Sequence, residues 1–436
     1  MRNEPAGALS RLGSSCYYVA QLTAIPLLLV IALSSTLREH GRTTRNKIIA
    51  WCCLLFLPLA TLALSCETPT DLQQSYRVPI QTNDGWTTAT VESVGMQRDP
   101  LESMLGLIAA TGDHMIHSIL IVRNQRLVFE EYWDGMDLDI ARGLDPITTE
   151  FDRETLHYMA SVSKSVTSAL VGIAIDQGLI AGVADPVFSF FPDYQDLNNS
   201  DKAQITLHHM LAMCSGYDWN EFEYGFDDPR DSHYQMFNTS DPLRFLLGRP
   251  VVAVPGTEFL YNSGDTNILG EVVRRTSASS YLADFAEAHL FGPLGIDSYR
   301  WTRLTLADSI TFASGGLYLR PRDMAKFGAL YLNDGSWNGE QIISTSWIDA
   351  SRDMAISLVG DYGTLYGYGY QFWLGCLRYR QTTIDYYRAA GWGGQYIYIM
   401  PDLDMVIVFT AGGYYDTRPL NFNTIIEDYI FAAVID

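Results

Sequence analysis

The chain has 436 residues, of which 47% are apolar and 12% aromatic, and its formal net charge is −21. A chain of this composition can bury a large core, which excludes an intrinsically disordered protein. The acidic surplus repels phosphate backbones, so the sequence predicts no nucleic-acid partner.

The first 66 residues differ from the rest and predict a segment directed to a membrane. Two apolar runs, 16–36 and 48–65, flank the basic stretch "REHGRTTRNK". The second run is typical of a signal peptide, and "LALSC" places Cys66 where a bacterial lipoprotein carries its lipid. Two retained transmembrane helices joined by a cytoplasmic basic loop are the alternative. Both interpretations put the remaining chain outside the cytoplasm, on the periplasmic or extracellular side of the cell envelope, with the membrane as a partner.

Cysteine usage follows the same division. Four of the six cysteines fall within the first 66 residues, which leaves Cys214 and Cys376 in the rest of the chain. Their apolar neighbours predict buried free thiols rather than a disulfide. The sequence contains no CxxC or HxxxH spacing, so it predicts no metal site and no cofactor.

After a polar linker at 67–89, the main domain at 90–436 begins with strands and continues with helices. The segment "HSILIVRNQRLVFEEYW" has two alternating runs separated by "RNQ", which predicts a β-hairpin. A helix is expected from Ser161 to a C-terminal cap at Gly178. A second helix is expected in "RPRDMAKFGALYLNDG", with Pro321 at its first position and Asp323 in its first turn.

The last third of the chain predicts further strands. The segments "YGYGYQFWL", "DYYRAAG", "GGQYIYIM" and "DMVIVFTAGG" alternate or run apolar, and "LNFNTIIEDYIFAAVI" closes the chain as a helix. Strands at both ends with helices between them predict an α+β fold. We expect one antiparallel sheet formed by the N- and C-terminal parts, flanked by helices, with a mainly helical subdomain inserted at about 160–317.

The stretch "MASVSKSVTSALVG" carries one of only four lysines in the chain. On a helix, Ser161 and Lys164 share one face at the N-terminus, where developing negative charge is stabilised. A serine hydroxyl needs a proton acceptor to become a nucleophile, and an amine buried among apolar side chains has a lowered pKa. The SxxK spacing alone is weak evidence, because it arises readily by chance.

Two later segments carry residues of similar interest. "PGTEFLYNSGD" places Tyr261 and Ser263 before an apolar helical run, although a tyrosine buried for packing is the simpler interpretation. "AAGWGGQYIYIM" surrounds Trp392 with glycines at the start of a strand. Glycines allow a ligand to approach backbone N–H groups that could bind an oxyanion, whereas an ordinary hairpin turn is the alternative.

Together and in this order, the three segments resemble the serine β-lactamase and penicillin-binding-protein superfamily. The resemblance is strongest to its class C-like branch, which includes family VIII esterases and 6-aminohexanoate-dimer hydrolases. The superfamily pattern is SxxK, then YxN or YxS, then KTG or a glycine-rich substitute, and these read here "SVSK", "YNS" and "WGG". The similarity extends over about residues 90–436.

This resemblance implies catalysis through an acyl-enzyme on a small ester or amide substrate. Ser161 would attack the carbonyl, while Lys164 and Tyr261 would accept its proton, and which of the two is the formal base stays open. Ser263 would relay a proton or orient Lys164. The oxyanion would bind the backbone N–H groups of Ser161 and Gln395, and the substrate-binding residues expected around them are Trp392, Gly393 and Gly394.

Two departures from the family pattern bear on the substrate. Trp392 replaces the KTG lysine, and Ser263 replaces the asparagine of YxN, so a β-lactam would lose a charge partner and an amide contact. We therefore expect an esterase or amidase acting on small or linear acyl substrates, with Arg388 either restoring a positive charge or facing solvent. A β-lactamase or DD-peptidase, and an inactive membrane-tethered binding module, are the alternatives. His157, His208 and His209 are expected to take no part, because this motif set needs no histidine.

Overall fold

The computed structural model describes residues 75–139, 146–304, 307–360, 363–415 and 420–435. The predicted membrane-directed segment, with Cys66, lies outside these ranges. Within them, none of the helices combines the length and the apolar character that a membrane span requires.

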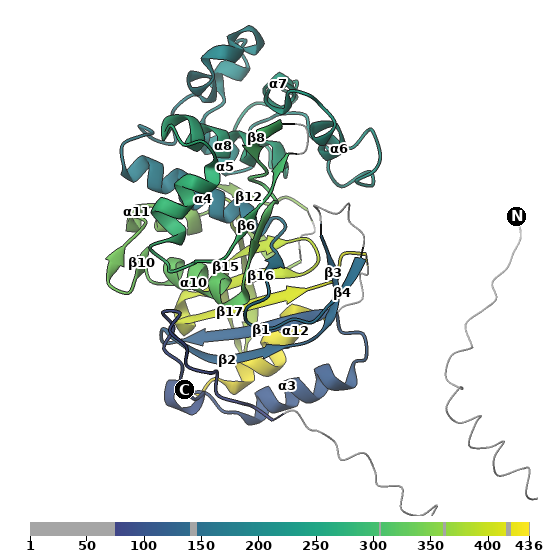
Figure 1. The fold of residues 1–436 in the computed structure, drawn as a ribbon, viewed down its shortest axis with the longest axis vertical. Helices are drawn as coiled ribbons and strands as arrows, with labels where there is room; N and C mark the ends of the chain where they lie inside the picture. Colours follow the sequence, from purple (N-terminus) through teal and green to yellow (C-terminus); the bar gives the residue numbers. More distant parts are fainter. Residues whose placement is uncertain (1–74, 140–145, 305–306, 361–362, 416–419, 436) are drawn as a thin grey trace, which may run out of the picture. The chain divides into compact units, whose positions relative to one another are not determined.

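An eight-stranded antiparallel sheet is the centre of the fold (Figure 1). Its spatial order is β12-β13-β14-β15-β16-β17-β1-β2. The strands are β1 (Ile116–Arg123), β2 (Arg126–Tyr132), β12 (Ile356–Ser357), β13 (Leu365–Tyr368), β14 (Trp373–Tyr379), β15 (Thr382–Gly391), β16 (Gln395–Met400) and β17 (Met405–Ala411). The first strand pairs with the last, with Leu120 opposite Val408. This confirms the predicted α+β fold, in which both ends of the chain build one sheet.

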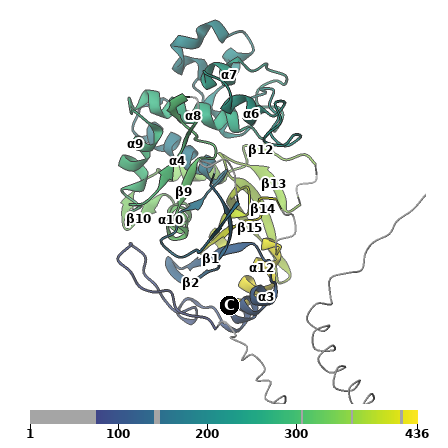
Figure 2. The same ribbon diagram turned by 45° about the vertical axis from the view of Figure 1, so that its right-hand side comes forward.

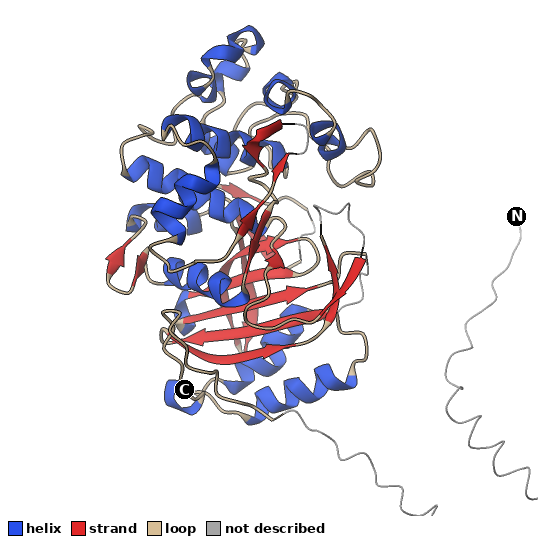
Figure 3. Ribbon diagram, in the orientation of Figure 1, coloured by secondary structure: helices blue, strands red, loops and turns tan. Residues whose placement is uncertain are grey.

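Helices cover both faces of the sheet (Figure 3). One face packs against α3 (Asp99–Ala110) and the C-terminal helical segment, which consists of α12 (Phe422–Ile425), η9 (Ile426–Ile430) and η10 (Phe431–Ala433). The other face packs against α4 (Val162–Asp176) and α10 (Pro321–Leu332). Successive strand side chains point to opposite faces. Accordingly, Ile119 and Ile121 belong to the apolar core on the α3 side of the sheet, whereas Leu120 and Val122 belong to the core on the α4 side.

The segment predicted as a helical insert gathers on one side of the sheet (Figure 2). Besides α4, its α- and π-helices are α5 (Leu207–Leu211), α6 (Ser232–Phe237), α7 (Pro242–Gly248), α8 (Ser263–Thr276), α9 (Leu282–Ala286) and η7 (Glu287–Phe291). Its two ends meet in a small sheet of β5 (His157–Tyr158), β9 (Leu317–Leu319) and β6 (Arg300–Trp301), where His157 pairs with Leu319. The start of α4 is therefore fixed where the insert joins the main sheet.

The remaining elements are short. They are η2 (Glu92–Val94), β3 (Gly135–Leu138), β4 (Pro146–Thr149), η4 (Val187–Phe190), η5 (Pro192–Leu197), η6 (Lys202–Gln204), β7 (Arg303–Leu304), β8 (Ala307–Thr311), β10 (Ser336–Trp337), β11 (Glu340–Gln341), α11 (Thr345–Arg352) and η8 (Pro401–Leu403).

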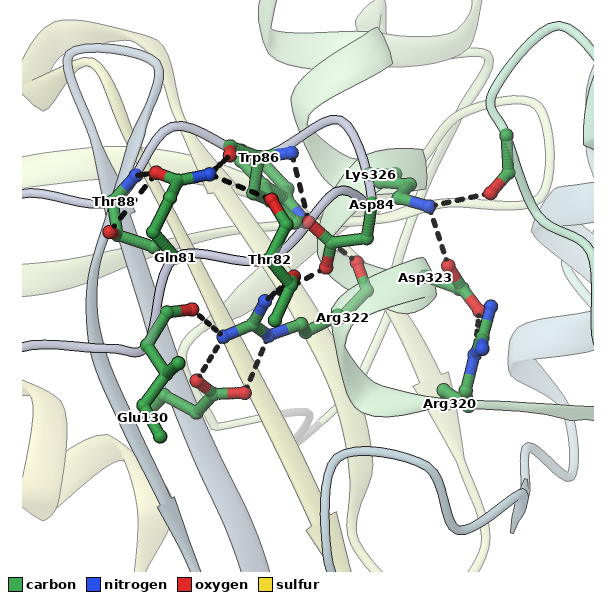
Figure 4. A network of polar contacts seen from close by, with 12 residues as sticks. Gln81, Thr82, Asp84, Trp86, Thr88, Glu130, Arg320, Arg322, Asp323 and Lys326 are labelled. Carbon is green, nitrogen blue, oxygen red and sulfur yellow. Dashed lines mark hydrogen bonds and ion pairs between the residues drawn. The ribbon is translucent and has the colours of Figure 1, made fainter.

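A buried ionic network ties the segment before η2 to helix α10 and strand β2 (Figure 4). The Arg322 side chain, which is 4% exposed, donates to both carboxylate oxygens of Glu130, at 2.7 and 2.5 Å. It also donates to Asp84 at 2.9 Å, to the Thr82 hydroxyl at 2.7 Å and to the Ile80 carbonyl at 2.9 Å. One guanidinium therefore joins three separate parts of the chain.

Candidate active site

Ser161 lies immediately before helix α4, at the end of a sharp turn. The preceding residue, Ala160, has φ of 44°, a left-handed conformation that residues with side chains rarely adopt. The turn is held by the Ser163 hydroxyl, which donates to the Ala160 carbonyl at 2.7 Å, and by the Met159 N–H, which donates to the Leu317 carbonyl at 2.9 Å. The half-buried Ser161 side chain is thereby presented at the N-terminus of a buried helix.

Lys164 lies one turn further along α4, with its side chain only 2% exposed. Its Nζ is 2.8 Å from Ser161 Oγ and 2.9 Å from the Ser314 carbonyl oxygen, as the i, i+3 spacing predicts for the serine contact. Burial lowers the pKa of Lys164 to about 8, although the nearby Glu221 carboxylate opposes this shift. At pH 7 roughly a tenth of Lys164 is therefore uncharged, far more than for a lysine in water.

Tyr261, two residues before α8, completes a three-residue cluster. Its ring lies 4.9 Å from Lys164 Nζ and stacks on Trp373 with centroids 5.5 Å apart. Burial and the Glu221 charge raise the pKa of Tyr261, whereas a hydrogen bond with Ser161 lowers it. The surroundings thus favour the uncharged forms of both Lys164 and Tyr261.

Ser263 is placed differently from the expectation that it orients Lys164. Its hydroxyl donates to Glu221 Oε1 at 3.0 Å, and its backbone N–H donates to Glu221 Oε2 at 2.9 Å. Glu221 is 5% exposed and also accepts a hydrogen bond from Trp219 Nε1. Sequence reasoning missed this carboxylate, because it lies in a loop that carries none of the motifs.

The strand before the third motif contacts the Ser161 turn through Gly391, the last residue of β15. A Cβ atom added there would lie 2.4 Å from the Met159 carbonyl oxygen and 3.2 Å from Ala160 Cβ. Only a glycine allows the strand to come this close. The residue that follows Gly391 in the turn is Trp392. Among the turn and loop backbone hydrogen bonds of the described chain, neither Ser161 N–H nor Trp392 N–H is a donor.

The predicted oxyanion donor, Gln395, lies across the hairpin from Gly391, and a Cβ atom added at Gly391 would be 3.1 Å from Gln395 Cβ. Gly393 and Gly394, with φ of 87° and 100°, form the turn, and Gln395 begins β16 opposite Gly391. Its buried side chain binds the end of β17, donating to the Ala411 carbonyl at 2.6 Å. Trp392 and Gln395 therefore both flank the contact with the Ser161 turn, the Gln395 side chain also fixes the hairpin, and its role as an oxyanion donor stays a prediction.

Arg388 does not belong to this cluster. It faces the side of the sheet opposite to Ala389, its guanidinium donates to the Tyr398 hydroxyl at 2.5 Å, and it lies over the Tyr396 ring at 4.9 Å. Neither of the two expected positions, in the pocket or in solvent, is correct. A ring of tyrosines on the other face of the sheet surrounds its charge.

Exposed aromatic rings surround the cluster. Phe222, which is 75% exposed, lies 5.6 Å from the Tyr261 ring. The rings of Phe226 and Tyr415 lie 5.0 and 5.7 Å from that of Trp392. One loop thus supplies an aromatic ring to each side of the site, and this rim offers an apolar surface.

Other residues discussed from the sequence lie in structural positions. His157 Nε2 is 2.8 Å from His117 Nδ1 in the core, His208 Nδ1 is 2.8 Å from the Tyr370 hydroxyl, and His209 closes the capping box of α5. Cys214 and Cys376 are free thiols; Cys214 is buried as predicted, whereas Cys376 is only half-buried. Within the described ranges no group of three or more His, Cys, Asp or Glu side chains is arranged to hold a metal ion.

Comparisons with known proteins agree with this arrangement. The family model named Beta-lactamase matches residues 112–425. A 6-aminohexanoate-dimer hydrolase from Paenarthrobacter ureafaciens is 27% identical over 245 residues, which cover 53% of this chain and 56% of that protein. The match thus spans little more than half of this relative.

Two solved structures share the fold. A putative 6-aminohexanoate-dimer hydrolase from Bacillus anthracis superposes with a TM-score of 0.61 at 21% identity, covering 84% of this chain and 92% of that one. A family VIII carboxylesterase superposes with a TM-score of 0.57 at 18% identity, covering 77% and 96%.

Proposed function

The chain belongs to the Beta-lactamase family of hydrolases, and on that premise we propose that it cleaves an ester or amide bond through an acyl-enzyme on Ser161. The observation that carries this proposal is the 2.8 Å contact between Ser161 Oγ and the Nζ of buried Lys164. An amine whose pKa is lowered to about 8 is an effective proton acceptor near neutral pH.

In the first step, neutral Lys164 takes the Ser161 proton while Oγ bonds to the substrate carbonyl carbon. The carbonyl oxygen becomes an oxyanion, which the N–H group of Ser161 and one from the hairpin residues Trp392 to Gln395 stabilise. Collapse of this intermediate breaks the ester or amide bond, and the leaving alcohol or amine takes a proton from the Lys164–Tyr261 pair. Water then attacks the acyl carbon and gives up a proton to the Lys164–Tyr261 pair. The bond to Ser161 Oγ breaks, Oγ takes this proton back, and the carboxylic acid leaves.

Lys164, rather than Tyr261, is the base in this proposal. Burial lowers the pKa of Lys164 and raises that of Tyr261, so a neutral amine forms far more readily than a phenolate. The tyrosine ring, which contacts both Lys164 and Ser161, is placed to pass a proton to the leaving group.

The surroundings of Ser161 support uncharged, apolar substrates. If Gly391 takes the place of the KTG glycine, the lysine position of that motif is occupied by Ala389, which is buried. The cationic partner for a substrate carboxylate is then missing, and the aromatic rim favours apolar acyl or leaving groups. We therefore place esters and linear amides ahead of β-lactams and cell-wall peptides.

Labelling with a fluorophosphonate probe tests the nucleophile. We expect wild type to be labelled and Ser161→Ala to remain unlabelled; equal labelling of the two proteins would remove Ser161 from this role. Turnover of p-nitrophenyl butyrate compared with nitrocefin then separates the esterase from the β-lactamase. Unlabelled wild type that turns over neither compound would support the inactive binding module instead.

We also propose that residues 1–66 attach the enzyme to the outer side of a membrane. The support is the pair of apolar runs around a basic stretch and the position of Cys66. Mass analysis of the mature N-terminus tests this: a lipidated Cys66 supports the lipoprotein form, an intact N-terminus supports retained spans, and a soluble chain without leader or lipid contradicts attachment.

A further inference from the structure

We propose that Glu221 is a positioning residue of this site, a buried anion that stabilises the ammonium form of Lys164. That form arises each time Lys164 takes the Ser161 proton. The inference rests on the proposed function, because it assumes that Lys164 is the proton acceptor. A buried carboxylate stabilises the imidazolium of a Ser-His-Asp hydrolase in a comparable way.

The contacts of Glu221 stabilise a negative charge. The carboxylate accepts hydrogen bonds from Trp219 Nε1, from the Ser263 hydroxyl and from the Ser263 N–H at the first turn of α8. Helix α8 spans 14 residues, so its N-terminus adds a favourable dipole. With 5% of its surface exposed, Glu221 is screened little by solvent.

No contacting cation neutralises this charge within the described chain, where the basic atom nearest to it is His233 Nε2, 3.8 Å from Oε2. Burial lowers the pKa of His233, the Glu221 charge raises it and the Lys164 charge lowers it; the net shift is downward, so the imidazole is uncharged near neutral pH. Lys164 Nζ lies 4.9 Å from the ring of Tyr261, two residues before the Ser263 that binds Glu221. Across this cluster the Glu221 charge raises the pKa of Lys164 against the effect of burial.

The other titratable groups around Glu221 come from three further elements. Burial raises the pKa of Tyr261 before α8 and of Tyr368 in β13, and it raises that of Asp265 in α8 well above its usual range. Asp231, the cap of α6, also has a raised pKa. Among these groups, Lys164 is the one that carries a positive charge near neutral pH while the Glu221 charge acts on it.

A purely structural role is the competing interpretation. Glu221 joins its own loop to the start of α8 through Ser263, and a glutamine would keep much of that connection. The two roles differ in their effect on Lys164: loss of the charge must lower its titration midpoint, whereas loss of a structural contact need not.

Lysine titration by NMR measures this effect without substrate. The chain contains only four lysines, so [6-¹³C]lysine labelling of the full-length protein gives at most four signals, and Lys164→Ala assigns the relevant one. We expect Glu221→Gln to lower the Lys164 midpoint by about one pH unit or more, as removal of a nearby opposite charge does. Glu223→Gln is the matched control, since Glu223 is an exposed residue of the same loop whose side chain accepts a hydrogen bond from Asn220 at 2.6 Å. The Lys164 midpoint of this variant should equal that of wild type.

The pH profile of ester hydrolysis is the second measurement. In Glu221→Gln its rising limb should move to lower pH, and its plateau should fall about tenfold because the protonated base is less stable. Glu221→Asp, which keeps the charge, should restore the midpoint. Two results would overturn the proposal. In the first, Glu221→Gln has the same Lys164 midpoint as wild type. In the second, Glu221→Asp lowers this midpoint as much as Glu221→Gln does.

The NMR outcome does not depend on turnover. An inactive wild-type enzyme would contradict the proposed function, while the coupling of Glu221 to Lys164 would still be measured. If Glu221→Gln does not fold, Ser263→Ala replaces it: Glu221 then loses one donor and keeps its charge, so the Lys164 midpoint should rise, and an unchanged or lower midpoint overturns the inference.

Discussion

At the scale of single residues, the proton affinity of Lys164 is set by its surroundings. Burial removes water from the ammonium group, and Glu221 restores part of the lost stabilisation. Because the folded pKa is lowered to about 8, the amine is charged below that pH and available as a base above it.

This predicts a pH dependence for hydrolysis of a neutral ester. The value of kcat/KM should rise with pH and reach half of its maximum near pH 8, where half of Lys164 is deprotonated. Lys164→Met should lower the rate by about 10²- to 10⁴-fold and abolish this limb while keeping the fold. A rate that is flat with pH in wild type would show that Lys164 is not the base.

The contact at Gly391 predicts a second outcome. In Gly391→Ala the new methyl group would lie 2.4 Å from the Met159 carbonyl oxygen, so the strand or the nucleophile turn must shift. We expect kcat to fall by about 10²-fold, the usual effect of losing one oxyanion donor. Gly106→Ala, in helix α3 with no atom within 4 Å of the added carbon, is the control and should keep full activity. Equal activity of the two variants would contradict an oxyanion donor beside the Gly391 contact.

Local spacing was a good guide to where the motif residues lie, while their catalytic roles stay predictions. Ser161 and Lys164 are in contact at the start of α4, and Tyr261 stands before α8, as their types and order indicated. Glu221 escaped prediction because the long loop that carries it has no periodicity, and only packing against α8 brings it to the site. Gln395 was chosen because "WGG" was aligned with KTG, and its role stays a prediction. The contact of Gly391 with the Ser161 turn was not predicted, because no local pattern encodes it.

At the scale of elements, helix α10 and strand β2 depend on Arg322. Arg322→Ala would leave the Glu130 carboxylate, with its side chain 3% exposed, without its cation. We expect the free energy of unfolding in urea to fall by about 3–5 kcal/mol, as for other broken buried pairs. Arg378→Ala breaks an ion pair with Asp428 in which the arginine side chain is 66% exposed, and should cost less than about 1 kcal/mol. Similar losses in the two variants would contradict a stabilising network.

The predicted elements were recovered where the pattern was strong. Alternation located the β1–β2 hairpin and strands β15–β17, and Pro321 marked the start of α10. The small sheet of β5, β9 and β6 was not predicted, because its strands are two or three residues long and β5 pairs with β9, which lies far along the chain, His157 with Leu319. The closing helix was expected as one piece, whereas it divides into α12, η9 and η10.

At the scale of the whole molecule, the net charge of −21 predicts an electrostatic bias in substrate encounter. A cationic ester should be hydrolysed with a higher kcat/KM than its neutral isostere in low salt. The ratio should fall toward one as the salt concentration rises to about 1 M, where screening acts over about 3 Å. A ratio that does not change with salt would show that the bias, if any, arises from contacts within the site.

The pairing of β1 with β17 has a consequence for how the protein is made. Residues 116–123 leave the ribosome long before their partner at 405–411 is synthesised. Until then the hairpin presents an open strand edge, which is prone to associate with other chains. Completion of the main sheet must therefore wait for β17, and a chain cut short before this strand would be a substrate for chaperones and proteases. For a protein exported as we propose, late closure keeps the chain unfolded while it is threaded through the membrane.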